Sequence, residues 1–259
     1  MIHLKSSEEI ERIRESGRIV AEALQLARAL CEPGVRTAQV DAEVEAYILS
    51  EAGRPSFKGY TPAGRAFPAS ACISINEEIV HGIPGDRQFR SGDLVGVDIG
   101  VEKAGYHADA ALSFVVGPPT PQQSRLLAQT REALQAGIQA AVAGHRIGDI
   151  SSAIQRHVEA AGFSVVRDLC GHGIGRSMHE APQVPNYGHP HTGPRLKPGM
   201  VLAIEPMVNA GTWRVTLQAD EWTVVTKDGS LSAHFEHTVA VTDSEPEILT
   251  ACPQFHGGR

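Results

Sequence analysis

Two carboxylates end matching apolar segments in the first and second parts of the chain. Asp98 closes the apolar run that follows Gly92, and Glu205 closes the corresponding run that follows Gly199. An ionised carboxylate at the end of a buried strand is costly unless a cation or hydrogen bonds compensate its charge. A single strand-end acid is most often a turn former or an ion-pair partner, but a duplicated one suggests that both acids are aimed at one point.

A second pair of acids repeats in the same order. Asp109 and Glu236 each lie two residues after a histidine, and an apolar stretch follows each acid. His172 adds an imidazole within a Gly-His-Gly sequence, although a lone histidine in that context is more often a loop residue. Four carboxylates and one imidazole suit divalent Mn, Fe, Co or Zn. Two ions about 3.5–4 Å apart that share carboxylates would balance four acids better than one ion, and would make a bridging water acidic.

Four helices are expected to position these residues. Ser6 and Glu9 form a capping box before a helix over 7–31, and Thr37 is expected to cap a helix that closes at Gly53. Amphipathic periodicity predicts two further helices over 121–143 and 149–161. The second and fourth helices each follow a Gly-x-Arg sequence and share an apolar spacing. Each half therefore runs helix, helix, strands, which indicates an internal repeat.

The strands are expected to group together rather than alternate strictly with the helices. Strands are predicted near 70–76, 94–100, 106–116, 164–168, 201–209, 212–217, 222–227 and 234–241, with a surface loop over 182–198. This segregation favours an α+β fold over a doubly wound sheet. We expect one catalytic domain over 1–259, built from pseudo-repeat halves of about 1–120 and 121–250.

Composition limits the classes of function. The chain has 259 residues, 42% of them hydrophobic, and a net charge of −7, which argues against nucleic-acid or anionic-membrane binding as its main role. Its four scattered cysteines, polar start and lack of a long apolar run predict a reduced, cytoplasmic protein with no membrane contact.

Six motifs carry a resemblance to a known family that extends over roughly residues 4 to 250. They are Cys72–Pro84, Gly92–Asp98, Gly105–Asp109, Cys170–Gln183, Leu196–Val208 and Ser232–Thr238. In these motifs the chain resembles the type I methionine aminopeptidases, which have the pita-bread metallopeptidase fold. The resemblance implies two pseudo-symmetric halves that share one curved antiparallel sheet, with helices on its outer face.

The resemblance also implies a ligand set for two divalent ions. In it, Asp98 chelates one ion, Asp109 and Glu236 bridge the pair, and His172 and Glu205 hold the other ion. The implied reaction removes the N-terminal methionine of nascent polypeptides, with a preference for a small second residue. A metal-bridging hydroxide attacks the carbonyl, and Glu205 also manages the proton of the water.

Two further histidines take catalytic and substrate-binding roles by the same resemblance. His81 is expected to contact the scissile amide nitrogen, and His179 to stabilise the developing oxyanion. The plain alternative for each is a polar wall of the pocket. Cys72, Phe67 and Trp222 match positions of the methionine pocket, although a core role would make the first two look the same.

Other positions are less distinctive or depart from the family pattern. Asn76 and Ser232 match positions that help to hold one monovalent cation, and their alternative reading is turn chemistry. The stretch 60–67 is longer than usual, Met178 replaces a common aromatic residue, and His234 stands where glutamine is frequent. His234 lies two residues before Glu236, so it is expected on the same strand face, near the metals. Its alternatives are a partner of a metal ligand, an extra weak ligand, or no role at the site.

Three alternatives to this function stay open at this stage. The first is another pita-bread hydrolase, such as an X-Pro aminopeptidase or dipeptidase, which usually carries an additional N-terminal domain. The second is a non-enzymatic binding protein on the same fold, and the third is creatinase-like chemistry. The expected partners are nascent peptide N-termini and a transient ribosome contact, with no specific nucleic acid, and the chain is expected to be a monomer.

Overall fold

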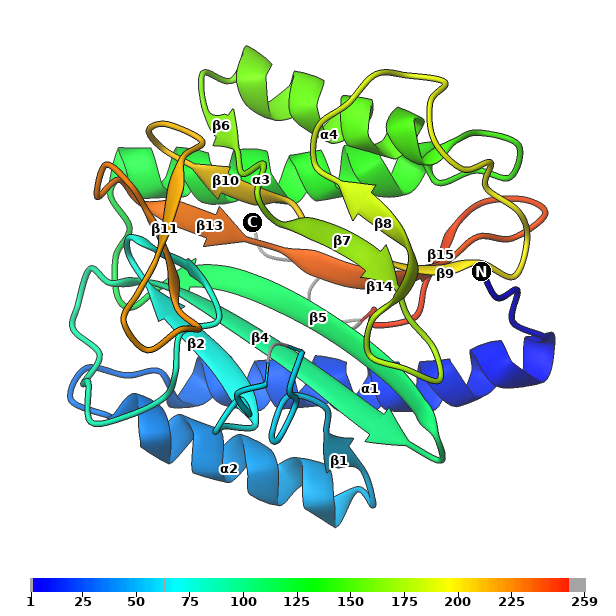
Figure 1. The fold of residues 1–259 in the computed structure, drawn as a ribbon. Coiled ribbons are helices and arrows are strands. Elements are labelled where there is room, and N and C mark those ends of the chain that lie inside the picture. Colours follow the sequence, from blue (N-terminus) through cyan, green and yellow to red (C-terminus); the bar gives the residue numbers. More distant parts are fainter. Residues whose placement is uncertain (1, 63, 252–259) are drawn as a thin grey trace.

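Helices enclose the strands on two sides in the computed structural model, which describes residues 2–62 and 64–251 (Figure 1). The four helices are α1 (Ser7–Leu30), α2 (Thr37–Ser50), α3 (Pro121–Ala140) and α4 (Ile147–Ala160). In Figure 1, α1 and α2 lie along the lower side of the molecule, and α3 and α4 lie along the upper side. The strands occupy the space between these two helix pairs.

The strands are mostly short, and the two longest have 10 residues each. They are β1 (Arg54–Pro55), β2 (Ala71–Ile75), β3 (Glu78–Val80), β4 (Leu94–Lys103), β5 (Tyr106–Val115), β6 (Ser164–Val165), β7 (Cys170–Gly173), β8 (Glu180–Pro185), β9 (Val201–Ile204), β10 (Met207–Asn209), β11 (Val215–Leu217), β12 (Val224–Thr226), β13 (Ser232–His234), β14 (Glu236–Ala240) and β15 (Glu247–Ile248).

One nine-stranded antiparallel sheet joins the two halves of the chain. Its order is β1-β4-β5-β14-β9-β7-β8, with β2 paired to β4 and β15 paired to β14. Two three-stranded sheets, β13-β10-β6 and β11-β12-β3, flank it. Strand β14 pairs with β5 on one side and with β9 on the other. Helices and antiparallel strands are thus segregated, and the predicted α+β class is confirmed.

The helix predictions hold in extent and fail in one detail. The Ser6 hydroxyl accepts from the Glu9 N–H at 3.3 Å, and the Glu9 carboxylate accepts from the Ser6 N–H at 2.9 Å, as the capping box requires. Thr37 does not cap α2, because it is already helical and the N-cap is Arg36. Its hydroxyl instead accepts from the Gly85 N–H and donates to the Gly85 carbonyl, which ties α2 to a distant loop.

Some strand predictions need correction. The segment 201–209 is two strands, β9 and β10, which belong to different sheets. The expected loop over 182–198 begins as strand β8, which extends to Pro185. His172, which a local reading assigns to a loop, lies in β7. Strands β1, β3, β7, β8 and β15 were not predicted. The predicted strand over 234–241 is interrupted at Phe235, so His234 ends β13 and Glu236 begins β14 in a different sheet.

The pseudo-repeat leaves matching marks on the backbone. Gly34 and Gly144 both adopt left-handed backbone angles, with φ of 89° and 93°. Each precedes an isolated antiparallel bridge at the start of the next helix, at Arg36 and Arg146. In the part of the chain that the structure describes, none of the helices has the length and apolar character needed to cross a bilayer.

Candidate metal centre

The register of the sheet brings the four predicted acids and His172 to one face. Asp98 on β4 lies opposite Ala111 on β5, and Ala111 lies opposite Glu236 on β14. Cross-strand neighbours point to the same face, as do residues two apart on a strand. Asp109, two residues before Ala111, therefore shares the face of Asp98 and Glu236.

The second half reaches the same face by an equivalent route. His172 on β7 lies opposite Ala203 on β9, and Ala203 lies opposite Thr238 on β14. Glu205 follows Ala203 by two residues, and Thr238 follows Glu236 by two. Strand β14 is thus the common neighbour through which both halves place their acids on one surface.

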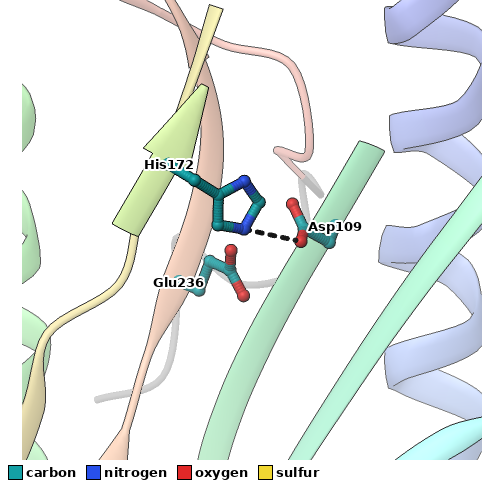
Figure 2. Close-up of side chains that lie close together, drawn as sticks. All are labelled: Asp109, His172 and Glu236. Atoms are coloured by element: carbon teal, nitrogen blue, oxygen red, sulfur yellow. Dashed lines mark ion pairs between the residues drawn. The ribbon is translucent and has the colours of Figure 1, made fainter. Parts of the chain in front are cut away.

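The ligand atoms of three residues converge closely. Atoms of Asp109, His172 and Glu236 lie within 4.8 Å of one another, and Figure 2 shows the three side chains pointing toward a common centre. His172 Nε2 lies 3.6 Å from Asp109 Oδ2 and 3.6 Å from Glu205 Oε1. The other ring nitrogen, Nδ1, lies 2.9 Å from the Gly173 carbonyl, to which it must donate. In the neutral ring this leaves the lone pair of Nε2 facing the carboxylates.

Burial disfavours the charges of these groups. It raises the pKa of Asp98, Glu205 and Glu236 well above their ordinary values, and the neighbouring carboxylates raise them further. Burial also raises the pKa of Asp109 to about 7. It lowers the pKa of His172 to about 4, so the ring is neutral. Acids this close cannot all be ionised at neutral pH without a compensating cation.

The residues present fit divalent metal. Asp98 Oδ1 and Glu236 Oε1 are buried and have no hydrogen-bond partner among the described residues. A buried carboxylate oxygen without a donor is expensive, and a metal ion removes that cost. Oxygen donors joined by one neutral imidazole match the preferences of first-row divalent ions.

A cavity of about 370 Å³ opens onto this cluster. All five expected ligands line it, together with several aromatic side chains. Its lining residues are Phe57, Tyr60, Pro62, Phe67, Cys72, His81, Asp98, Asp109, His172, Met178, His179, Glu205, Trp222 and Glu236. Every residue expected for catalysis, metal binding or the methionine pocket is among them.

Both expected catalytic histidines border the cavity as neutral rings. The ring of His179 lies 4.1 Å from that of His172 and stacks on Tyr60 at 5.2 Å. Burial, with smaller repulsion from a neighbouring histidine, lowers the pKa of His81 and of His179 to about 4. His81 has a left-handed backbone with φ of 60°, a strained conformation that is uncommon outside functional sites.

Aromatic edges form the apolar wall. Phe67 packs edge-on against Trp222 at 5.2 Å and against Phe57 at 6.4 Å. Trp222 also meets the ring of His81 edge-on at 6.2 Å. The indole Nε1 of Trp222 is buried without a hydrogen-bond partner among the described residues, so a donor is available at this wall.

The two residues expected at a monovalent cation lie together, outside the cavity. The Ser232 N–H donates to the Asn76 carbonyl at 3.0 Å. Asn76 stands in the turn after β2 with a left-handed φ of 62°, and its side chain reaches the start of β4, where it donates to Asp93 and accepts from the Leu94 N–H. The Ser232 hydroxyl lies 2.9 Å from Asn209 Oδ1. The turn chemistry considered as an alternative is therefore present at Asn76.

Several positioning residues were missed from sequence. The Thr238 hydroxyl accepts from the Asp109 N–H at 3.0 Å and donates to its carbonyl at 2.7 Å. The Asn186 amide donates to the Glu205 carbonyl at 3.0 Å. Thr238 could have been found, because it lies two residues after Glu236 on the same face. Asn186 offered no such signal, because it lies in a segment expected to be a surface loop.

Sequence comparisons relate the chain to known metallopeptidases. Residues 11–243 match the metallopeptidase family M24. The chain is 50% identical to a methionine aminopeptidase of Clostridium acetobutylicum, over 97% of this chain and 100% of that protein. It is 49% identical to methionine aminopeptidase 1 of Bacillus subtilis, over 96% of this chain and 99% of that protein.

Structural comparisons separate two kinds of neighbour. A methionine aminopeptidase from Thermotoga maritima superposes with a TM-score of 0.94 and 44% identity, over 97% of this chain and all of that one. The prolidase from Pyrococcus furiosus superposes with a TM-score of 0.77 and 25% identity, but this chain covers only 65% of it. The fold is common to both kinds, and the full-length match is to the first.

Proposed function

This chain belongs to metallopeptidase family M24, and from that premise we propose how its cavity removes the N-terminal methionine of a polypeptide. The proposal rests on one observation, which is that two chemically different surfaces line the same cavity. Buried acids and His172 form one, and aromatic side chains form the other. The chain is a metal-dependent aminopeptidase with the pita-bread fold.

We propose that the cluster holds two divalent ions. Asp98 would bind one ion, His172 and Glu205 the other, and Asp109 and Glu236 would bridge them. When bound, such ions polarise the scissile carbonyl and lower the pKa of water. These donors can bind Mn, Fe, Co or Zn.

The chain's own side chains then manage protons and charge. Glu205 accepts the proton of the attacking water, and burial raises the pKa of its carboxyl above its ordinary value, which makes the carboxylate a stronger base. His179, neutral and stacked on Tyr60, donates to the oxygen of the substrate carbonyl as negative charge develops there. His81 contacts the amide nitrogen and supports its departure.

The aromatic wall accounts for the choice of methionine. Methionine is flexible and polarisable, and its sulfur gains from contact with ring edges. Phe67 and Trp222 present such edges at right angles to each other, with Cys72 buried beside them.

Release of free methionine tests the proposal. Metal-free protein is incubated with Met-Ala-Ser, Met-Leu-Ser and an Xaa-Pro peptide, with and without added Mn or Co. Metal-dependent cleavage of Met-Ala-Ser, with little cleavage of the other two, is expected. Cleavage of the Xaa-Pro peptide alone would overturn the assignment in favour of the alternative, an X-Pro aminopeptidase or dipeptidase.

The cellular setting is also proposed. The substrates are nascent chain N-termini met in the cytoplasm, with transient ribosome contact, and the enzyme is a single-domain monomer. Asn76 and Ser232 remain the predicted site of one monovalent cation. Co-sedimentation with ribosomes, analytical ultracentrifugation and the dependence of thermal stability on K⁺ or Na⁺ test these points separately.

A further inference from the structure

The side chain of His234 is a buried imidazole next to the metal cluster. The proposed mechanism gives this residue no role. Its exposed fraction is 3%, and its Nε2 has no hydrogen-bond partner among the described residues. Ser113 fixes its backbone on both sides, since the His234 N–H donates to Ser113 Oγ at 3.0 Å and that hydroxyl donates to the His234 carbonyl at 2.8 Å. The sheet thus holds the backbone of His234 in place, while its buried Nε2 has no partner among the described residues.

The unpaired nitrogen faces an oxygen of Glu205. His234 Nε2 lies 3.7 Å from Glu205 Oε2, and His172 Nε2 lies 3.6 Å from Glu205 Oε1. The Glu205 carboxylate therefore lies between two imidazoles, with one oxygen toward each. Both separations are too long for a hydrogen bond.

These separations suit atoms that share a metal ion. Two donors each about 2.1 Å from one ion lie roughly 3.0–3.5 Å apart in octahedral or tetrahedral arrangements. His172, a proposed ligand, stands 3.6 Å from both Glu205 and Asp109, just beyond this range. His234 repeats the spacing within 0.1 Å of those values. His234 Nε2 is buried, has no hydrogen-bond partner among the described residues and lies close to a proposed ligand, so it is suited to bind a metal ion.

We infer that His234 is an additional nitrogen donor to the ion that Glu205 holds, so that this chain offers four carboxylates and two imidazoles. The inference rests on the proposed metal site. It predicts a shifted metal preference, because imidazole favours Co and Zn, whereas Mn is better served by oxygen donors. His234 is then a determinant of which metal the enzyme retains.

The test counts imidazoles at the metal and measures affinity in the same proteins. Metal-free wild type, His234→Gln and the control His157→Gln are titrated with Co and with Mn by calorimetry, and the Co-loaded proteins are examined by X-ray absorption. His157 is a suitable control because it lies on α4 and pairs with Glu132, away from the metal cluster. Glutamine is similar in reach to histidine and keeps the site polar.

The expected result is one imidazole fewer per protein in His234→Gln. Its affinity for Co should fall about tenfold to a hundredfold, which is the range typical of mutations of residues around a metal site. Its affinity for Mn should fall less, and the control should match wild type. Equal imidazole counts and equal Co affinities in His234→Gln and wild type would overturn the inference.

Two further outcomes keep the inference apart from the proposed function. If His234→Gln does not fold, the wild-type protein decides alone, since two imidazoles per protein support the inference and one contradicts it. If wild type binds no divalent ion, the proposed function fails as well. If wild type binds ions through one imidazole, only the inference fails.

Discussion

A buried ion pair anchors the segment that carries His179, and breaking it should impair both stability and catalysis. Lys5 Nζ lies 2.7 Å from Glu180 Oε2, and the two side chains are only 4% and 11% exposed. The other oxygen of Glu180 accepts from the Ser177 N–H at 3.1 Å. The Lys5 N–H donates to the Gly199 carbonyl at 2.7 Å. The start of the chain therefore holds the turn that ends at His179 against the sheet.

Replacing Lys5 with methionine would leave the Glu180 carboxylate buried without its cation. Breaking a buried pair in this way costs about 3–5 kcal/mol. The low end of that range applies here, since Glu180 keeps the Ser177 hydrogen bond and some contact with water. A loss of about 3 kcal/mol raises the equilibrium constant for unfolding by more than a hundredfold. We also expect kcat to fall, because the adjacent His179 loses its support.

The assay is urea denaturation of the metal-free protein together with steady-state release of methionine. Lys5→Met, Glu180→Gln and the double variant form a thermodynamic cycle. The double variant should recover much of the lost stability, because no charge is left buried. A coupling energy near zero in this cycle would refute the reasoning, as would a Lys5→Met protein with the stability and kcat of wild type.

The Lys5–Glu180 pair also makes the folding stability depend on pH. Burial acts to raise the pKa of Glu180, but hydrogen bonds from Lys5 and the Ser177 N–H outweigh it and lower the pKa below its ordinary value of 4.5. A carboxyl with a lowered folded-state pKa stabilises the fold above its unfolded-state pKa, and this stability is lost as pH falls through the folded value. The stability gap between wild type and Lys5→Met should therefore be full at pH 7 and shrink below about pH 4.

Three further predictions follow from the site. Glu236→Ala and Asp109→Ala should each abolish activity and weaken the binding of both ions, measured by calorimetry; turnover in either variant would contradict the bridging role. His179→Ala should lower kcat about a hundredfold, as expected for the loss of an oxyanion donor, and an altered metal affinity would point to a structural role instead. Gly171→Ala should destabilise the fold by about 3 kcal/mol and weaken metal binding, because the new Cβ would lie 2.3 Å from the Ala203 carbonyl oxygen; an unchanged melting temperature would show that β7 can shift freely.

Asp98 and Glu205 could be predicted from sequence because they end apolar runs, and the duplicated frame indicated that they act together with Asp109 and Glu236. The helices were predicted for a similar local reason, since α1 carries its own capping box and apolar spacing. These features depend on residues close together in the chain. Local chemistry was therefore enough to identify them.

What could not be predicted depends on contacts between distant segments. The glycines around His172 suggest a loop, but they are required because a Cβ at Gly171 or Gly173 would collide with the backbone of Ala203 or Ala181. Close strand packing and flexible turns both select glycine, so sequence cannot distinguish them. The pair between Lys5 and Glu180 joins residues 175 positions apart, and no local pattern marks it.

The position of β14 between β5 and β9 has a consequence for biosynthesis. Glu236 is the last of the ligands to be synthesised, and it reaches the other acids only when β14 enters the gap between the two halves. A growing chain that ends before residue 232 would carry the earlier ligands but no strand to hold them together. Tight binding of divalent metal would therefore require β14. Bound metal would then distinguish the complete enzyme from unfinished chains.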